Sequence, residues 1–236
     1  MDNNETFERL YNELEDLLRT KYHLEATASA VYFHENRVGG QQAKNLRILR
    51  ELRNYVVHGK RNDVIEACVV TDVAIRYLEK TIDAIKRPVR AIDTCTLHQK
   101  ILFASLSSPL KPLMKTMLER NISHVPILRS DGTVYGVFSG ATLFAGATAN
   151  EKMAIDDATT IQAFSAYLPI KNHAGERYWF IARTTPIEEI IELFGTTMQD
   201  GKKLKMLFVT ENGRPEEKIL GLITPWDILD DDVVAA

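Results

Sequence analysis

Arg53 and His58 are the residues of the N-terminal half whose types and spacing best suit chemistry. The guanidinium of an arginine presents a rigid fork of donors that matches a phosphate. A histidine titrates near neutral pH, with an unperturbed pKa of about 6.5, and can therefore transfer protons. Without a metal or a nucleophilic serine, such a pair suits cleavage of RNA by its own 2′-hydroxyl. The histidine would act as general base or acid, and the arginine would stabilise the charge of the phosphorane.

The spacing of these two residues sets a geometric condition. Five residues along an ideal helix turn through about 500°, which leaves the two side chains about 140° apart. They converge only if the helix ends near His58, which Gly59 would allow, or if they meet across a two-fold interface between chains.

Helices are predicted throughout the part of the chain that carries this pair. The sequence pattern favours helices in four segments: 7–22, about 23–34, 41–58 and about 63–86. The last segment has a start signal at Asn62 or Asp63, and it ends before Pro88. No hairpin signal precedes that proline. We therefore expect a four-helix bundle in residues 1–87.

The segment around Arg53 also matches a family pattern. Leu52–Gly59 reads Leu-Arg-Asn-Tyr-Val-Val-His-Gly and lies late in the expected bundle. It resembles the HEPN superfamily, whose hallmark is an arginine, a polar residue and then a histidine. The resemblance covers residues 1 to about 87 and implies a homodimer with a composite cleft at its interface. Many members are metal-independent endoribonucleases that leave a cyclic phosphate, and others are inactive. By this match Arg53 and His58 are catalytic, with Asn54 as the supporting polar residue.

Other interpretations of the same residues stay open. His58 can simply end a helix, with Arg53 on the surface of a bundle that has no catalytic activity. Residues 44–61 carry six lysines and arginines against the single acid Glu51. Such a stretch is typical both of a solvated helix face and of a surface that faces a polyanion.

After residue 88 the pattern changes to β-branched runs, tight turns and shorter helices, and it repeats itself. Three pairs of segments align: Leu106–Leu110 with Arg183–Ile187, His124–Ile127 with Met206–Val209, and Gly136–Ser139 with Gly221–Thr224. Asp131-Gly132 and Asn212-Gly213 mark hairpins. Each block is expected to run strand, helix, strand, turn, strand, helix. Neither block can bury its own sheet, so we expect a pseudo-two-fold pair.

Two motifs in this duplicated part carry a second resemblance. Asn121–Ile127 matches the second-strand motif of the CBS domain, and Gly221–Leu229 matches its final strand–helix motif. The tandem, over roughly 88–231, therefore resembles a CBS-domain pair (a Bateman module). The expected fold class is α + α/β, in which a four-helix bundle precedes two β-α-β-β-α repeats. CBS repeat 1 is expected in 88–150 and CBS repeat 2 in 151–236.

The CBS resemblance implies an adenosine nucleotide (ATP, ADP or AMP), bound between the repeats as a regulatory ligand. The family's motif places Thr224 at the phosphate and Asp227 at the ribose, where a carboxylate can accept both hydroxyl protons. The first repeat keeps the hydroxyl at Ser139 but has Thr142 in place of the aspartate, so we expect the second site to be better. Asp227 can also be an ordinary first-turn acid favoured by the helix dipole. The remaining expected wall residues are Ile122, Ser123, His124, Pro126, Arg183 and Thr184.

Composition bounds the class of protein. The chain has 236 residues, of which 45% are hydrophobic and 26% charged, with a net charge of −3. These values favour a soluble protein of two domains. Its apolar runs are far shorter than the ~18–20 residues of a membrane span, and no apolar leader is present. Cys68 and Cys95 have neither disulfide nor metal spacing. We expect a cytoplasmic protein without a metal or a required cofactor.

Two hypotheses for the whole chain follow. The first is a nucleotide-regulated, metal-independent endoribonuclease, a homodimer that acts on RNA when the CBS pair permits. The alternative is a non-enzymatic adenine-nucleotide sensor or adaptor in which the helical bundle only mediates dimerisation. A cyclic oligonucleotide or an S-adenosyl ligand would make similar adenosine contacts.

Overall fold

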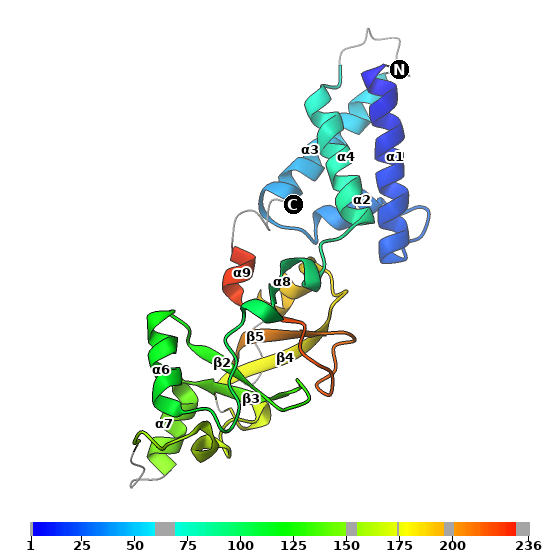
Figure 1. The fold of residues 1–236 in the computed structure, drawn as a ribbon. Coiled ribbons are helices and arrows are strands. Elements are labelled where there is room, and N and C mark those ends of the chain that lie inside the picture. Colours follow the sequence, from blue (N-terminus) through cyan, green and yellow to red (C-terminus); the bar gives the residue numbers. More distant parts are fainter. Residues whose placement is uncertain (1, 60–68, 150–154, 174, 196–200, 230–236) are drawn as a thin grey trace. The chain divides into compact units, whose positions relative to one another are not determined.

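The computed structural model divides the chain into two units, Met1–Pro88 and Val89–Ala236 (Figure 1). Each unit is described by itself. The residues that the structure describes are 2–59, 69–149, 155–173, 175–195 and 201–229. None of the helices in these ranges is both long and apolar enough to cross a membrane.

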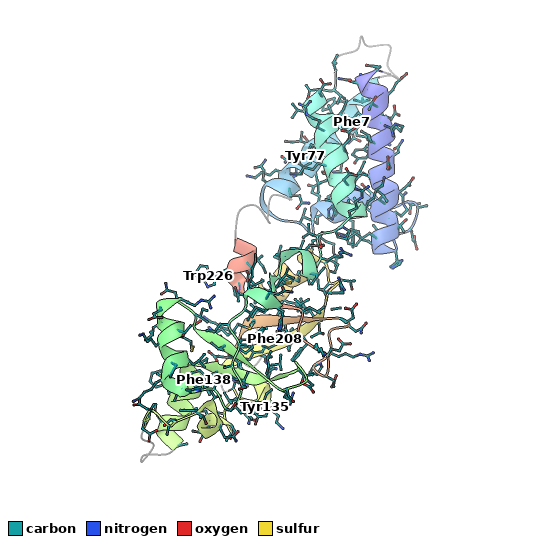
Figure 2. The ribbon with its side chains drawn as sticks, in the orientation of Figure 1. Phe7, Tyr77, Tyr135, Phe138, Phe208 and Trp226 are labelled. Atoms are coloured by element: carbon teal, nitrogen blue, oxygen red, sulfur yellow. The ribbon has the colours of Figure 1, made fainter. Side chains whose placement is uncertain are left out.

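The described part of unit 1 is helical. It contains α1 (Asn3–Tyr22), α2 (Ala30–Glu35), α3 (Gly40–Gly59) and α4 (Asp72–Lys86). All four helices contribute side chains to one apolar core, which includes Phe7, Leu14, Val31, Leu46 and Leu78. Figure 2 labels Phe7 and Tyr77, which come from α1 and α4. Three long helices and one short helix therefore share this core, so the unit is not a bundle of four comparable helices.

The second helix differs from the prediction. It was expected over about 23–34, but residues 23–29 are not helical, and α2 begins only at Ala30. His23 ends α1 in the left-handed conformation, with φ of 53°. Ser29 then caps α2, because its hydroxyl accepts a hydrogen bond from the Tyr32 amide. With Asn36 as its C-cap, α2 contains only six residues.

The start of α4 also differs from the prediction. The expected start at Asn62 or Asp63 lies outside the described residues, but residues 69–71 are described and are not helical. The Asn4 side chain accepts from the Val70 amide at 2.9 Å, and the Asn3 side chain donates to the Val70 carbonyl at 3.0 Å. These bonds hold Val70 in an extended segment against α1. The helix begins at Asp72, capped by the side chain of Thr71.

Unit 2 mixes helices and strands in a duplicated order. The elements are α5 (Ala91–Thr94), β1 (Thr96–Leu97), the 3-10 helix η1 (His98–Lys100), α6 (Leu110–Glu119), β2 (His124–Leu128), β3 (Val134–Ser139), α7 (Gly140–Ala149), the 3-10 helices η2 (Ile161–Phe164) and η3 (Ile170–Asn172), β4 (Glu176–Ala182), α8 (Ile187–Gly195), β5 (Lys203–Thr210), β6 (Gly221–Ile223) and α9 (Pro225–Leu229). One sheet has the order β1-β6-β5-β4, and β2 pairs with β3 in a second sheet. The series α6, β2, β3, α7 corresponds to the series α8, β5, β6, α9.

The two series follow the predicted block order with one exception. Both predicted hairpin turns contain a glycine with positive φ: Gly132 has φ of 83° and Gly213 has φ of 78°. The second block begins with β4, which runs parallel to β5. The first block has no regular strand at this place, and only Ala104 makes a parallel bridge, with Ile127. The leading strand predicted for the first block is therefore reduced to a single bridge.

The segment that precedes each block packs on the other block. Ala91 donates its amide to the Thr185 carbonyl at 2.8 Å, and Ile187 donates to Val89 at 2.8 Å. In the same way Leu110 donates to Thr159 at 2.9 Å. β1 pairs with β6, while the Val137 amide of β3 donates to Leu168 at 3.0 Å. The two blocks thus exchange their leading segments, 89–97 and 159–168, in a pseudo-two-fold manner.

Glycine makes this exchange sterically feasible at two equivalent positions. A Cβ on Gly136 would overlap the carbonyl group of Leu168 in the crossing segment. A Cβ on Gly221 would overlap the Cys95 side chain and would lie 2.8 Å from the Thr96 carbonyl oxygen. Both glycines were found in the sequence as matched positions of the repeat. Close approach of another backbone is the reason that each needs to be glycine.

The apolar cores follow the exchanged segments. Ile161 and Phe164 pack with Phe138 in the core of the first block, and Ala91 and Cys95 pack with the core of the second. A third cluster joins the sheets and includes Val137, Tyr178, Phe208 and Leu222. Figure 2 labels Phe138 and Phe208, which lie on β3 and β5.

Candidate functional site

Asp227 lies in the first turn of α9 and is fixed by the residue at the start of that turn. Its Oδ2 accepts from the Thr224 amide and from the Thr224 hydroxyl, both at 2.7 Å. Its Oδ1 accepts only one hydrogen bond, a long one of 3.3 Å from the Thr96 hydroxyl. A carboxylate oxygen has about two acceptor positions, so Oδ1 keeps capacity for a further hydroxyl. Asp227 therefore both caps its helix and presents an accepting oxygen.

The surroundings of Asp227 come from the exchanged segment as well as from the second repeat. Thr96 belongs to β1, which precedes the first block. Burial, the largest cause, raises the pKa of the Cys95 thiol, and the negative charges of Asp227 and Asp93 raise it further. Nothing in the spacing of the sequence connected residues 95 and 96 to Asp227, because the contact depends on β1 crossing to β6.

Arg183 and Thr184 follow the end of β4. The Arg183 side chain makes an exposed ion pair with Glu211, with a distance of 3.2 Å between Nη1 and Oε2. Its backbone carbonyl accepts from the Ile92 amide at 3.1 Å, which ties it to the exchanged segment. Thr184 is exposed. Trp226, which stands between Thr224 and Asp227 in the sequence, has 80% of its surface exposed (Figure 2).

In the first repeat Thr142 stands where Asp227 stands in the second. Its hydroxyl donates to the Val137 carbonyl at 3.2 Å, and it accepts from the Ser139 amide at 3.2 Å. Thr142 is buried. Thr142 therefore performs the capping function that the aspartate has in the second repeat, but its buried hydroxyl offers no acceptor to a ligand.

The carboxylate near Ser139 comes from a different element, the first residue of β4. Glu176 Oε2 accepts from Tyr178 at 2.7 Å, from Ser139 at 3.0 Å and from His173 Nδ1 at 3.2 Å. Its Oε1 lies 2.9 Å from His124 Nε2. Only 12% of the Glu176 side chain is exposed. Four side chains thus converge on one nearly buried carboxylate.

The electrostatics of this cluster favour the charged form of Glu176. Burial acts to raise its pKa, but the hydrogen bonds from His124, His173 and Tyr178 together lower the pKa of Glu176 far below its usual range. The pKa of Tyr178 is raised, first by burial and then by its hydrogen bond to Glu176. Glu176 and His173 were not singled out from the sequence. No local motif marks them, because β4 and the preceding loop meet Ser139 only in the folded chain.

The residues predicted to bind nucleotide fall into two groups. Thr224, Asp227, Arg183 and Thr184 lie at the second repeat. His124 and Ser139 bind Glu176, and Ser123 lies 2.7 Å from His124 through its hydroxyl. Ile122 packs against the core of the first block, and Pro126 is buried in β2. Among the described residues no hydrogen bond or ion pair joins one group to the other, so the wall residues near His124 belong to the first repeat.

A groove of about 720 Å³ lies in unit 1. Its lining residues come from α1, the α1–α2 connection, α2 and α3, and they include Tyr11, Glu15, Arg19, Tyr32, Arg50, Arg53 and Asn54. Arg19 pairs with Asp16 at 2.8 Å, and Arg50 pairs with the buried Glu35 at 3.1 Å. Within the described residues, Arg53 makes no hydrogen bond and no ion pair. The groove thus contains two arginines held by carboxylates and a third whose donors are free.

The end of α3 bears on the geometric condition for Arg53 and His58. The helix extends to Gly59, so His58 lies in its last turn, next to the helix end that the sequence predicted. The His58 side chain lies outside the described part of the chain. Both predicted ways of bringing the two side chains together, at the helix end or across two chains, therefore stay predictions.

Comparisons with known proteins find a similarity in part of unit 2. A family model described as CBS domain matches residues 89–144, so this segment is similar to a CBS domain. Among curated proteins no relative matches the sequence. Solved structures that match include one described as CBSX2 in complex with AMP, with 15% identity, a TM-score of 0.44 and coverage of 62% of this chain and 97% of that chain.

Two further solved structures have similar scores. A protein from Vibrio cholerae assigned to acetoin utilization (AcuB) has 17% identity and a TM-score of 0.44, covering 63% of this chain and 93% of that chain. The CBS domain of a bacterial CNNM/CorC family Mg²⁺ transporter, in complex with the inhibitor IGN95a, has 15% identity and a TM-score of 0.43. That match covers 78% of this chain and 96% of the other.

Proposed function

We propose that unit 2 is a CBS pair that binds an adenosine nucleotide at Thr224 and Asp227 and thereby regulates unit 1. The observation that carries this proposal is the Asp227 carboxylate, which is held by Thr224 yet keeps an accepting Oδ1. Ribose hydroxyls require such an acceptor. The Thr224 hydroxyl can rotate from Asp227 toward a phosphate, and the exposed Arg183 guanidinium supplies donors that suit the same group.

Calorimetry tests this site directly. ATP, ADP and AMP are titrated into the full chain and into Asp227→Asn, which keeps the size of the side chain but loses its charge. We expect the variant to lose about 10- to 100-fold in affinity, since a hydrogen bond to a charged group contributes about 1.5–3 kcal/mol. Asp157→Asn, at an exposed aspartate of unit 2, is the matched control and should bind as the unaltered chain does. Equal affinity in all three proteins would remove the ribose assignment.

For unit 1 the proposed activity is metal-independent cleavage of RNA by a homodimer. The specific support is Arg53, which lines the groove of unit 1 and whose guanidinium has no hydrogen-bond or ion-pair partner among the described residues. In this mechanism Arg53 stabilises the phosphorane and Asn54 orients the substrate. His58 of the partner subunit acts as the general base that takes the proton of the 2′-hydroxyl. A switch from mostly inactive to mostly active requires about 5.5 kcal/mol of differential nucleotide affinity between the two states.

The nuclease proposal is tested with RNA and EDTA, with and without adenine nucleotides. We expect Arg53→Ala and His58→Ala to abolish cleavage, whereas Arg76→Ala, an exposed arginine on α4, leaves it unchanged. Cleavage that survives in both variants would refute the assignment. Sedimentation of the full chain as a monomer would refute it as well, because the proposed site combines Arg53 of one chain with His58 of the partner subunit.

The competing function is a non-enzymatic adenine-nucleotide sensor or adaptor in which unit 1 only mediates dimerisation. The carboxylates that hold Arg19, Arg47 and Arg50 favour it, since they remove most of the positive charge that RNA would need. This alternative predicts nucleotide binding that depends on Asp227 but no cleavage of RNA with any ligand.

A further inference from the structure

The two repeats use the same hydroxyl position but different carboxylates. In the second repeat the Thr224 hydroxyl donates to Asp227, three residues further along the chain, at 2.7 Å. In the first repeat the Ser139 hydroxyl donates to Glu176, which comes from β4 of the other repeat, at 3.0 Å. Thr142 occupies the place of the aspartate and turns its hydroxyl inward to Val137. A carboxylate is therefore present at both sites, but only one of them belongs to the local helix.

The two carboxylates differ in what they can still accept. Glu176 receives four hydrogen bonds, three at Oε2 and one at Oε1, which is about the full capacity of a carboxylate. It is also nearly buried. Asp227 receives three, and one of them is the long bond from Thr96. Glu176 consequently has almost no acceptor capacity left for a ribose hydroxyl, whereas Asp227 keeps such capacity at Oδ1.

The groups around Glu176 are donors that converge on an anion. His173 places Nδ1 3.2 Å from Glu176 and Nε2 3.1 Å from the Leu168 carbonyl. The His173 ring therefore lies between the carboxylate of Glu176 and a backbone carbonyl oxygen. Lys202 donates to the carbonyl of His173 at 2.9 Å and adds positive charge beside it. Among the described residues no group of His, Cys, Asp and Glu is arranged to hold a metal ion. The cluster is thus built as a receptor for a negatively charged oxygen group.

We propose that Glu176 occupies the anion position of the first repeat, so that the chain's own carboxylate closes this repeat and each chain binds a single nucleotide. This inference rests on the proposed nucleotide site of the second repeat. Without Glu176, the side chains of His124, Ser139, His173 and Tyr178 form a site for an oxyanion, such as the phosphate of a nucleotide or inorganic phosphate. Glu176 thereby determines how many ligands the pair accepts.

The first test counts binding sites by calorimetry with AMP on the full chain. We expect about one equivalent for the unaltered protein and none for Asp227→Ala. The double variant Asp227→Ala/Glu176→Ala should bind about one equivalent again, now at the first repeat. The matched control is the double variant Asp227→Ala/Glu189→Ala, which changes an exposed glutamate of α8 instead of Glu176. It should not bind AMP.

Two results overturn the proposal. The first is two equivalents for the unaltered protein, or one equivalent that survives in Asp227→Ala, because the first repeat would then be open with Glu176 in place. The second is no gain from removing Glu176 in a variant that keeps its circular dichroism spectrum. Glu176→Ser also empties the anion position but keeps a small polar side chain, and it serves if the alanine variant does not fold. The counts on the unaltered and Asp227→Ala proteins need neither variant.

Inorganic phosphate separates this inference from the proposed function. If the unaltered chain binds no AMP, the proposed nucleotide site is refuted, but Glu176→Ala should still bind phosphate at least 10-fold more tightly than the unaltered chain does. Ser139→Ala in the same background should remove part of that gain, since the hydroxyl is one of the donors. Equal phosphate affinity with and without Glu176 overturns the inference whatever happens with AMP.

Discussion

The two repeats of unit 2 have the same order of elements, yet they place their acids by different routes. In the second repeat Asp227 is local, and it closes a hydrogen-bonded turn with Thr224. In the first repeat Glu176 crosses from the other block and is enclosed by four donors. The difference shows that a repeat without the motif aspartate can still have a carboxylate at its site. In a duplicated fold, a segment of the other repeat lies close enough to supply it. It also predicts that the two repeats respond differently to equivalent substitutions.

The largest difference is expected at the two matched glycines. Gly136→Ala forces a Cβ against the backbone of Leu168, which cannot move without disturbing its bond to Val137. Overpacking of this kind should cost about 3 kcal/mol. Gly221→Ala meets a side chain, that of Cys95, as well as the Thr96 carbonyl, and should cost less. Chemical denaturation of unit 2 measures both values. Gly140→Ala, where a Cβ has open space, is the control and should not destabilise the protein; equal losses at residues 136 and 221 would contradict the comparison.

The second difference concerns acid. Because the folded state lowers the pKa of Glu176, its stabilising contribution is fully present above the unfolded value of about 4.5. It is lost progressively as pH falls below that value, by up to about 1.4 kcal/mol per pH unit for one proton. Glu176→Gln should be about 2–3 kcal/mol less stable at pH 7, through loss of hydrogen bonds to a charged group. It should also lose stability less steeply than the unaltered chain between pH 4.5 and 3.

Urea unfolding across this pH range provides the measurement. Parallel stability curves for Glu176→Gln and the unaltered chain would show that the carboxylate is not held in its charged form. Glu188→Gln, on α8, is a suitable control, because it changes the net charge equally and lies on the surface.

The smallest effect is expected at the local acid. Asp227→Asn weakens the cap of α9 but leaves a side-chain oxygen that can accept from the Thr224 amide, so the protein should lose about 1 kcal/mol or less. Its nucleotide affinity should fall much more than its stability. Thermal unfolding combined with Trp226 fluorescence on nucleotide addition separates the two effects, since Trp226 is exposed beside the site. A stability loss as large as that of Glu176→Gln would mean that Asp227 has a mainly structural role.

Local sequence patterns were sufficient to predict much of this architecture. The three pairs of matched segments and the two hairpin turns predicted the order from α6 to α9, and the family match over 89–144 agrees with the first block. Thr224 and Asp227 were assigned through the resemblance of Gly221–Leu229 to a CBS motif, whose residues are contiguous in the chain. Interactions of this range are encoded in neighbouring residues, so a single sequence displays them.

Long-range interactions were missed for the same reason. The start of α4 depends on Asn3 and Asn4, which are more than 60 residues from Val70 in the chain. Glu176 meets Ser139 across 37 residues, and Thr96 meets Asp227 across 131. His124 and Ser139 were predicted as residues of the nucleotide site, and in the structure both contact Glu176. Their actual partner is a glutamate that no spacing rule connects to them.

The exchange of leading segments has a consequence for synthesis on the ribosome. The first block cannot complete its core until Ile161 and Phe164 have left the exit tunnel, and β1 has no partner until β6 emerges more than 120 residues later. Nascent chains whose β6 has not yet emerged must therefore keep one strand edge unpaired, with the exposure to aggregation that such edges bring. Translation pauses late in the message would prolong that vulnerable interval, whereas a pause before residue 89 would leave only helical unit 1 to fold.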